Sequence, residues 1–136
     1  MKIAPLIKLR ENSRDQQRRA LHEAELYEDA LRARIGEIEF RLSRNLSDWR
    51  LTGLRQPVPL EELRLLETQR QELNRLKDEA QKRLAEAVEA TEKARGALSE
   101  AVQNVRVLEN LRDRKESEMG AAAKKVEQKN LDQRSF

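Results

Sequence analysis

A regular heptad of small and branched residues between Leu84 and Leu108 constrains the fold of this chain more than any other feature. Counting Leu84 as position a places the seam residues as follows: Leu84, Thr91, Leu98 and Val105 at a, and Ala87, Ala94, Ala101 and Leu108 at d. An alternating spacing of three and four residues is typical of a coiled-coil seam. Alanine at three d positions predicts a closely packed partner helix, and we expect that partner to be the N-terminal half of the same chain.

The composition favours a rod over a globular core. Of the 136 residues, 39% are charged and 3% are aromatic, which leaves little material for a thick hydrophobic interior. Only four Gly and three Pro interrupt the many Leu and Ala residues, which favour helix. We therefore predict an all-α fold, an elongated two-helix antiparallel coiled-coil hairpin with a longer C-terminal helix, forming one domain over residues 1–136.

The prolines set the expected boundaries of the two helices. Pro5 suits a first helical turn, so the first helix should span about 5–51. Pro57 and Pro59 end a helix, which predicts a turn at about 52–59 and a second helix at about 60–132. A turn centred near Gln56 would place Trp49 beside Leu63. The second helix would then extend past its partner by about 25 residues, or roughly 38 Å at 1.5 Å per residue.

The first helix has a less regular seam. Its expected seam residues are Leu6, Leu9, Ala20, Ala24, Tyr27, Leu31, Ile35, Ile38, Leu42, Leu46 and Trp49. Successive steps of four at Tyr27, Leu31 and Ile35 predict a stutter that relaxes the supercoil. Near the turn, apolar side chains outnumber those that two helices can cover, which is typical of a partner surface. Trp49 either caps the turn or docks a partner.

The sequence argues against several other classes of protein. The net charge is only +3 and the basic residues are spread evenly, so strong nucleic-acid binding has little support. There is no cysteine, which fits a reducing cytoplasm, and the apolar run at the start is too short for a signal peptide or a membrane span. His22 has no carboxylate pattern around it, and no phosphate loop or catalytic constellation is visible. We expect no metal site, no cofactor and no enzyme activity.

The C-terminal run closely resembles the signature end of the FliJ family of flagellar type III export proteins. Leu108, Leu111 and Arg114 match its "L-x-x-L-x-x-R" segment, and a later "E/D-Q-K-x-L/M-D" ending is matched by Glu127, Gln128, Lys129, Leu131 and Asp132. The opening PLIKLREN is also similar to the start of that family.

This resemblance implies a cytoplasmic stalk, peripherally associated with the inner-membrane export apparatus. Its termini would enter a hexameric export ATPase and promote ring assembly and turnover, while the hairpin engages the export gate, a membrane protein, and export chaperones. The implied ATPase-binding residues are Leu6, Leu9, Leu108, Leu111, Arg112, Arg114, Gln128, Lys129 and Asp132. The implied gate-binding residues are Leu42, Trp49, Leu73 and Leu76. No nucleic acid and no direct membrane insertion are expected.

Several alternatives remain open at the level of sequence. The chain could be the equivalent stalk of an injectisome, an RNA-binding helical arm, or a scaffold in which the second helix pairs with another copy. The hairpin interpretation expects an isolated monomer. The patch Gly120–Ala123 either suits a helix enclosed by another protein or reflects plain helix propensity.

Overall fold

Two long helices make up nearly all of the computed structural model, which describes residues 3–134. Helix α1 spans Ile3–Gly53 and helix α2 spans Leu60–Arg134, and residues 54–59 connect them. No strand occurs within these described residues. The predicted all-α helical hairpin is confirmed, with helix ends two residues beyond the expected ones at both ends of α1 and at the end of α2.

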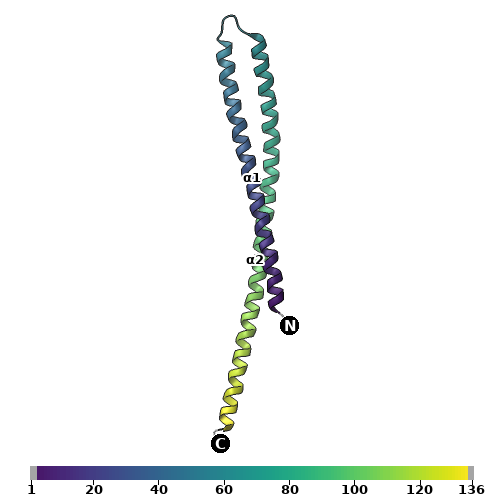
Figure 1. Cartoon of the computed structure of the whole chain (residues 1–136), viewed down its shortest axis with the longest axis vertical. Helices are drawn as coiled ribbons and strands as arrows, with labels where there is room; N and C mark the ends of the chain where they lie inside the picture. Colours follow the sequence, from purple (N-terminus) through teal and green to yellow (C-terminus); the bar gives the residue numbers. More distant parts are fainter. Residues whose placement is uncertain (1–2, 135–136) are drawn as a thin grey trace. The chain divides into compact units, whose positions relative to one another are not determined.

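The chain divides into two compact units. The tip unit comprises residues 21–94 and contains the turn with the adjoining parts of both helices, which lie side by side in Figure 1. The terminal unit comprises residues 1–20 and 95–136, of which 3–20 and 95–134 are described. In the terminal unit the start of α1 lies beside the first part of its α2 segment, and the yellow end of α2 lies beside no other element (Figure 1).

The turn closes with few backbone hydrogen bonds. The N–H groups of Leu54 and Arg55 donate to the carbonyls of Leu51 and Thr52, each at 3.2 Å, and so satisfy the last carbonyls of α1. Pro57 and Pro59 follow, and neither has an N–H group to continue the helix. At the start of α2, Glu61 and Glu62 complement the positive end of the helix dipole.

In the tip unit, α1 presents an unbroken heptad to α2. Its buried or half-buried positions step by three and four residues throughout: Leu21, Ala24, Glu28, Leu31, Ile35, Ile38, Leu42, Asn45, Trp49 and Thr52. The facing positions on α2 follow the same rule: Leu63, Leu66, Arg70, Leu73, Lys77, Ala80, Leu84, Ala87, Thr91 and Ala94. Polar residues therefore occupy regular seam positions on both helices.

The predicted stutter in α1 is wrong. The Tyr27 side chain is 53% exposed, and Glu28 occupies the seam instead. Selecting only apolar residues forced the two steps of four, because the true seam residue is polar. For the same reason Ala20 and Leu46 are exposed, while their neighbours Leu21 and Asn45 lie in the seam.

The register of the hairpin is fixed by contacts between the two helices. The amide nitrogen Nδ2 of Asn45, a residue only 5% exposed, donates a hydrogen bond of 2.9 Å to the main-chain carbonyl of Leu66. Nearer the other end of the unit, the Lys77 ammonium lies 3.6 Å from a carboxylate oxygen of Glu39. These pairs agree with the predicted alignment around a turn near Gln56.

The terminal unit has a shorter seam. Ile3 and Ile7 of α1 are buried, as are Ala101 and Val105 of α2. The predicted seam of α2 is confirmed here and in the tip unit, because all eight heptad residues from Leu84 to Leu108 are buried or half-buried. Leu9, however, is 62% exposed and does not belong to the seam.

Within the described residues, neither helix contains a stretch that is long and apolar enough to span a membrane.

Most of the ion pairs seen among the described residues join neighbours on one helix, such as Glu37 with Arg41 at 2.9 Å and Glu79 with Arg83 at 2.8 Å. Exposed pairs of this kind each contribute about 0.3–0.5 kcal/mol to helix stability. Glu72 pairs with Arg75 in the same way, at 2.6 Å.

Candidate functional site

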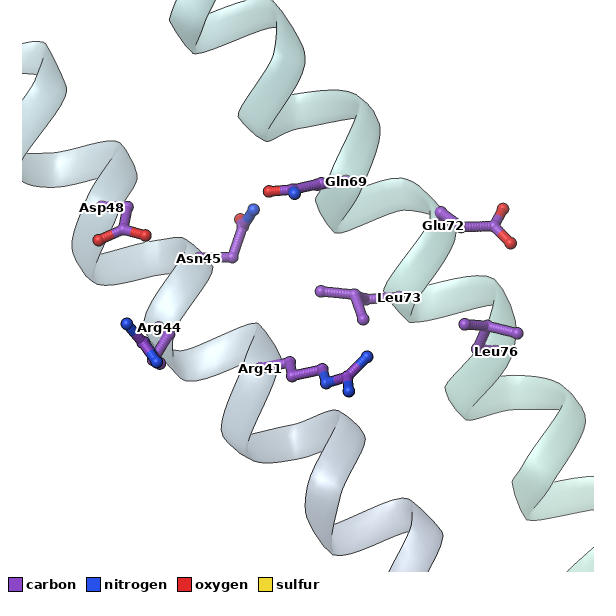
Figure 2. Close-up of a pocket in the computed structure, with 8 residues that line it drawn as sticks. All are labelled: Arg41, Arg44, Asn45, Asp48, Gln69, Glu72, Leu73 and Leu76. Carbon is purple, nitrogen blue, oxygen red and sulfur yellow. The ribbon is translucent and has the colours of Figure 1, made fainter.

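A row of hollows runs along one face of the tip unit, between α1 and α2. The largest has a volume of about 420 Å³ and is lined by the eight residues labelled in Figure 2: Arg41, Arg44, Asn45, Asp48, Gln69, Glu72, Leu73 and Leu76. Figure 2 shows Asn45 of α1 and Gln69 and Leu73 of α2 pointing into the space between the helices, whereas Glu72 points away from it. The short Asn45 side chain leaves room that a leucine at this seam position would fill.

Neighbouring hollows share residues and so form one groove. Asp48 also lines a hollow of about 300 Å³ nearer the turn, together with Leu51 and Leu65. Toward the other end of the unit, Leu76 and then Arg83 connect the largest hollow to two smaller ones. We call this feature the seam groove, and it extends from the turn as far as Ala24 and Ala90.

The two edges of the seam groove differ in charge. The α1 edge carries Arg34, Arg41 and Arg44 with one carboxylate, Asp48, and the α2 edge carries Glu62, Glu72, Glu79 and Glu86 with one guanidinium, Arg83, so the α1 edge is mainly basic and the α2 edge mainly acidic. Such a groove fits a partner helix whose own edges have the opposite arrangement of charge.

At the α2 edge of the groove, Glu72 is bound by two hydrogen bonds from a single arginine. Arg75 donates to it from both Nε, at 3.0 Å, and Nη2, at 2.6 Å. This two-pronged hydrogen bond, helped by the charge of Arg75, lowers the pKa of Glu72 against the weaker opposing effect of desolvation. The same contact raises the pKa of Arg75.

The residues proposed to bind the export gate do not form one surface. Leu73 and Leu76 line the seam groove, whereas Leu42 and Trp49 are half-buried elsewhere in the seam. The Arg70 guanidinium lies over the Trp49 ring, 5.7 Å from its centroid. The polar members of the groove were not identified from the sequence; counting strict steps of three and four from Ile38 would have reached Asn45.

The residues proposed to bind the ATPase fall into two groups. Leu6, Leu108 and Leu111 are half-buried, and Leu9 is exposed, as described above. The polar members of the set are all exposed: Arg112, Arg114, Gln128, Lys129 and Asp132.

These polar residues belong to a continuous stretch of helix with no buried residue. From Arg112 to Arg134 each residue of α2 is exposed, and we call this stretch the exposed C-terminal run. The heptad of the seam continues into it with Arg112, Met119, Val126 and Gln133 at a and with Lys115, Ala122 and Lys129 at d. Met119 is 72% exposed and Val126 is 59% exposed, so a short apolar segment in phase with the seam, Met119–Val126, faces solvent between charged heptad positions.

Among residues 3–134, no group of three His, Cys, Asp or Glu residues is arranged to hold a metal ion. What the seam groove and the exposed C-terminal run offer chemically is helix-to-helix recognition, through apolar stripes bordered by charge.

Comparison with known proteins gives one match. Residues 1–135 match the family described as "Flagellar FliJ protein", which covers essentially the whole chain. The searches of curated proteins and of solved structures found no significant match. Because the family match covers far more than half of the sequence, the chain belongs to the flagellar FliJ protein family.

Proposed function

We propose that this chain is the non-enzymatic stalk of the flagellar type III export apparatus, and that its exposed C-terminal run inserts into a hexameric export ATPase. Membership of the family links the chain to that export apparatus. The observation that carries the finer proposal is the unbroken exposure of α2 from Arg112 to Arg134. An isolated helix of this length is marginal in water, so a partner that encloses it would supply the missing packing.

The side chains along the run suit this role. Met119, Ala122 and Val126 provide a short, slim apolar segment; Arg112 and Lys129 stand at its two ends on the same heptad line, and Arg114, Gln128 and Asp132 add hydrogen-bonding groups beside that line. Leu6, Leu9, Leu108 and Leu111 lie in the terminal unit and are proposed to contact the ring where the run leaves the seam. The ring would gain assembly contacts, and its turnover would rise when the run is bound.

The tip unit is proposed to contact the export gate and the export chaperones. Leu73 and Leu76 support this because they line the seam groove, whose charged edges would orient an incoming helix. Leu42 and Trp49 are proposed to act with them as part of the underlying seam. The chain would thus be held peripherally at the membrane through its partners.

The test is steady-state ATP hydrolysis by the cognate export ATPase at rising concentrations of the intact chain. We expect the chain to raise turnover, and Arg112→Glu combined with Arg114→Glu to abolish that rise. The matched control combines Arg64→Glu with Lys82→Glu, which reverses two exposed charges in the tip unit and should leave the rise intact. If the intact chain leaves turnover unchanged and does not co-elute with the ATPase, the proposal is wrong.

Amide hydrogen exchange provides a second measurement. In the isolated chain, residues 112–134 should exchange faster than residues 101–108, whose seam is packed. Added ATPase should slow exchange in the run. Strong protection of the run in the isolated chain would contradict the proposed ordering inside the ring.

A further inference from the structure

The outward face of α1 in the tip unit carries a second heptad, in which five of eight positions are apolar. Its members recur at steps of four and three residues and are all exposed: Leu26, Ala30, Ala33, Glu37, Phe40, Arg44, Ser47 and Leu51. Arg44 and Leu51 also lie at the α1 edge of the seam groove. Leu54 extends the series into the turn. The large members are strongly exposed, with Leu26 at 54%, Phe40 and Leu51 at 63%, and Leu54 at 77%. We call this the outer stripe.

The corresponding face of α2 is different. Its residues at the same heptad positions are mostly charged: Leu65, Thr68, Glu72, Arg75, Glu79, Lys82, Glu86, Glu89 and Lys93. These charged side chains are hydrated by solvent, so the outward face of α2 needs no partner to cover it. The outer stripe on α1 has the spacing of a coiled-coil seam and extends for about 38 Å at 1.5 Å per residue, yet among the described residues no other element covers it.

We propose that the outer stripe is a self-association surface, through which two copies of the chain pair α1 against α1 in antiparallel orientation. The charges along the stripe favour a second copy of the chain as the partner, and they favour the antiparallel orientation of the two α1 helices. An antiparallel pair aligned on the stripe places Leu26 opposite Leu51 of the other copy at both ends. The same alignment places Asp29 beside Arg50 of the other copy, twice by symmetry.

A parallel pair is less favourable. It would set Glu37 beside Glu37 and Arg44 beside Arg44 of the other copy within the stripe itself, and like charges that close repel. In the antiparallel pair, Glu37 instead lies opposite Phe40 and Arg44 opposite Ala33 of the other copy, and Glu37 and Arg44 of the two copies are one helical turn apart. Neither Asp29 nor Arg50 makes an ion pair among the described residues, so both are available.

Along one flank of the antiparallel interface the charges repel. Arg34 lies near Arg41 of the other copy there, and this repulsion keeps the association weak and reversible. The chain is thus monomeric when dilute and dimeric when concentrated, and the dimer excludes any other partner from this face of α1.

Analytical ultracentrifugation over a wide range of concentration tests the proposal. We expect the mass to rise toward that of a dimer. Phe40→Glu should hold the chain at monomer mass with its helix content unchanged, because Phe40 is exposed. Val107→Glu is the matched control, since Val107 is 64% exposed on α2 and belongs to the terminal unit, outside the outer stripe.

Charge variants test the alignment. Asp29→Arg should weaken association at least tenfold, and adding Arg50→Asp should restore it. Arg34→Glu should strengthen association severalfold, because it turns the repulsive flank into an attractive one. A wild-type mass that stays monomeric at every concentration up to the solubility limit would overturn the proposal.

Disulfide trapping tests the direction, since the chain has no cysteine of its own. The double variant Leu26→Cys with Leu51→Cys should form cross-linked dimers under mild oxidation. Leu26→Cys alone should not, because two copies of position 26 lie at opposite ends of an antiparallel pair. Efficient cross-linking of the single variant would overturn the antiparallel arrangement.

Discussion

The Asn45 side-chain amide donates a 2.9 Å hydrogen bond to the main-chain carbonyl of Leu66, across the seam of the tip unit. A buried asparagine at a seam position costs stability relative to an aliphatic residue and fixes the alignment of the two helices. This hydrogen bond joins Asn45 of α1 to the carbonyl of one particular residue of α2. A hairpin in which α1 is shifted along α2 to another register would lose it.

Substitutions of Asn45 should affect the stability of the hairpin and the alignment of α1 with α2 differently. Asn45→Ala should destabilise the hairpin by about 1 kcal/mol, because a hydrogen bond is lost at a buried position. Asn45→Leu should match or exceed the wild-type stability, because it fills the space beside the largest hollow, and it should permit slipped alignments. Urea unfolding measures the first effect, and cysteine pairs placed for native and slipped alignments measure the second. If Asn45→Leu traps only the native pair, the amide is not what fixes the alignment.

The contact between Trp49 and Arg70 should contribute about 0.5–1 kcal/mol as a cation–π interaction. Arg70 occupies a seam position, so its aliphatic stem also packs between the helices. A double-mutant cycle of Trp49→Leu and Arg70→Met isolates the pairwise contribution. Trp49 is the only tryptophan in the chain, so its fluorescence reports on this site alone. A coupling energy near zero would show that the two residues stabilise the seam independently.

Thr91 should not tolerate a larger side chain. It is 2% exposed, and its hydroxyl donates a 3.0 Å hydrogen bond to the carbonyl of Ala87, one turn earlier on the same helix. The surrounding alanines leave little space, so Thr91→Leu should destabilise the hairpin by about 1–3 kcal/mol through overpacking. Thr91→Val is the matched control, since it keeps the shape and should change stability by less than about 1 kcal/mol. Equal stability of both variants in thermal unfolding would argue against a tightly packed seam here.

The low pKa of Glu72 predicts a small acid sensitivity. Arg75 stabilises the charged carboxylate in the folded chain, so the unfolded chain binds the proton more readily. The stabilisation is therefore complete above the ordinary glutamate pKa and is lost as the pH falls through the lowered value. A carboxyl NMR titration should place the Glu72 transition below the ordinary glutamate range. Arg75→Met should return it to the ordinary range, and an unchanged transition would exclude Arg75 as the cause.

The fold followed from the sequence because its strongest signals are local and periodic. The heptad from Leu84 to Leu108, the prolines at 57 and 59, and the alignment around Gln56 all derive from simple spacing, and the structure agrees with each. The seam of α1 was predicted less well. Hydropathy cannot choose Glu28 over Tyr27, or Asn45 over Leu46, because burial there is decided by the phase of the heptad and not by the polarity of the residue.

The candidate sites were less accessible to prediction. The seam groove depends on side-chain lengths at adjacent levels of two helices, such as those of Asn45 and Leu73, which line the same hollow, and spacing within one helix does not reveal such a combination. Leu73 and Leu76 stand out in the sequence because they are apolar, whereas the charged residues that line the groove with them have the same pattern as any solvent-exposed charges of a coiled coil. The exposed run was anticipated, because unequal helix lengths alone leave one helix without a partner.

The exposed C-terminal run also bears on how long a copy of the chain survives. Lysine and arginine side chains recur along residues 112–134, and each residue there is open to solvent. Local fraying of such a helix offers its peptide bonds to proteases, whereas the packed seam resists them. A partner that encloses the run would shield these bonds, so copies without a partner should be degraded first, and the supply of stalks would adjust to the number of partners that hold them.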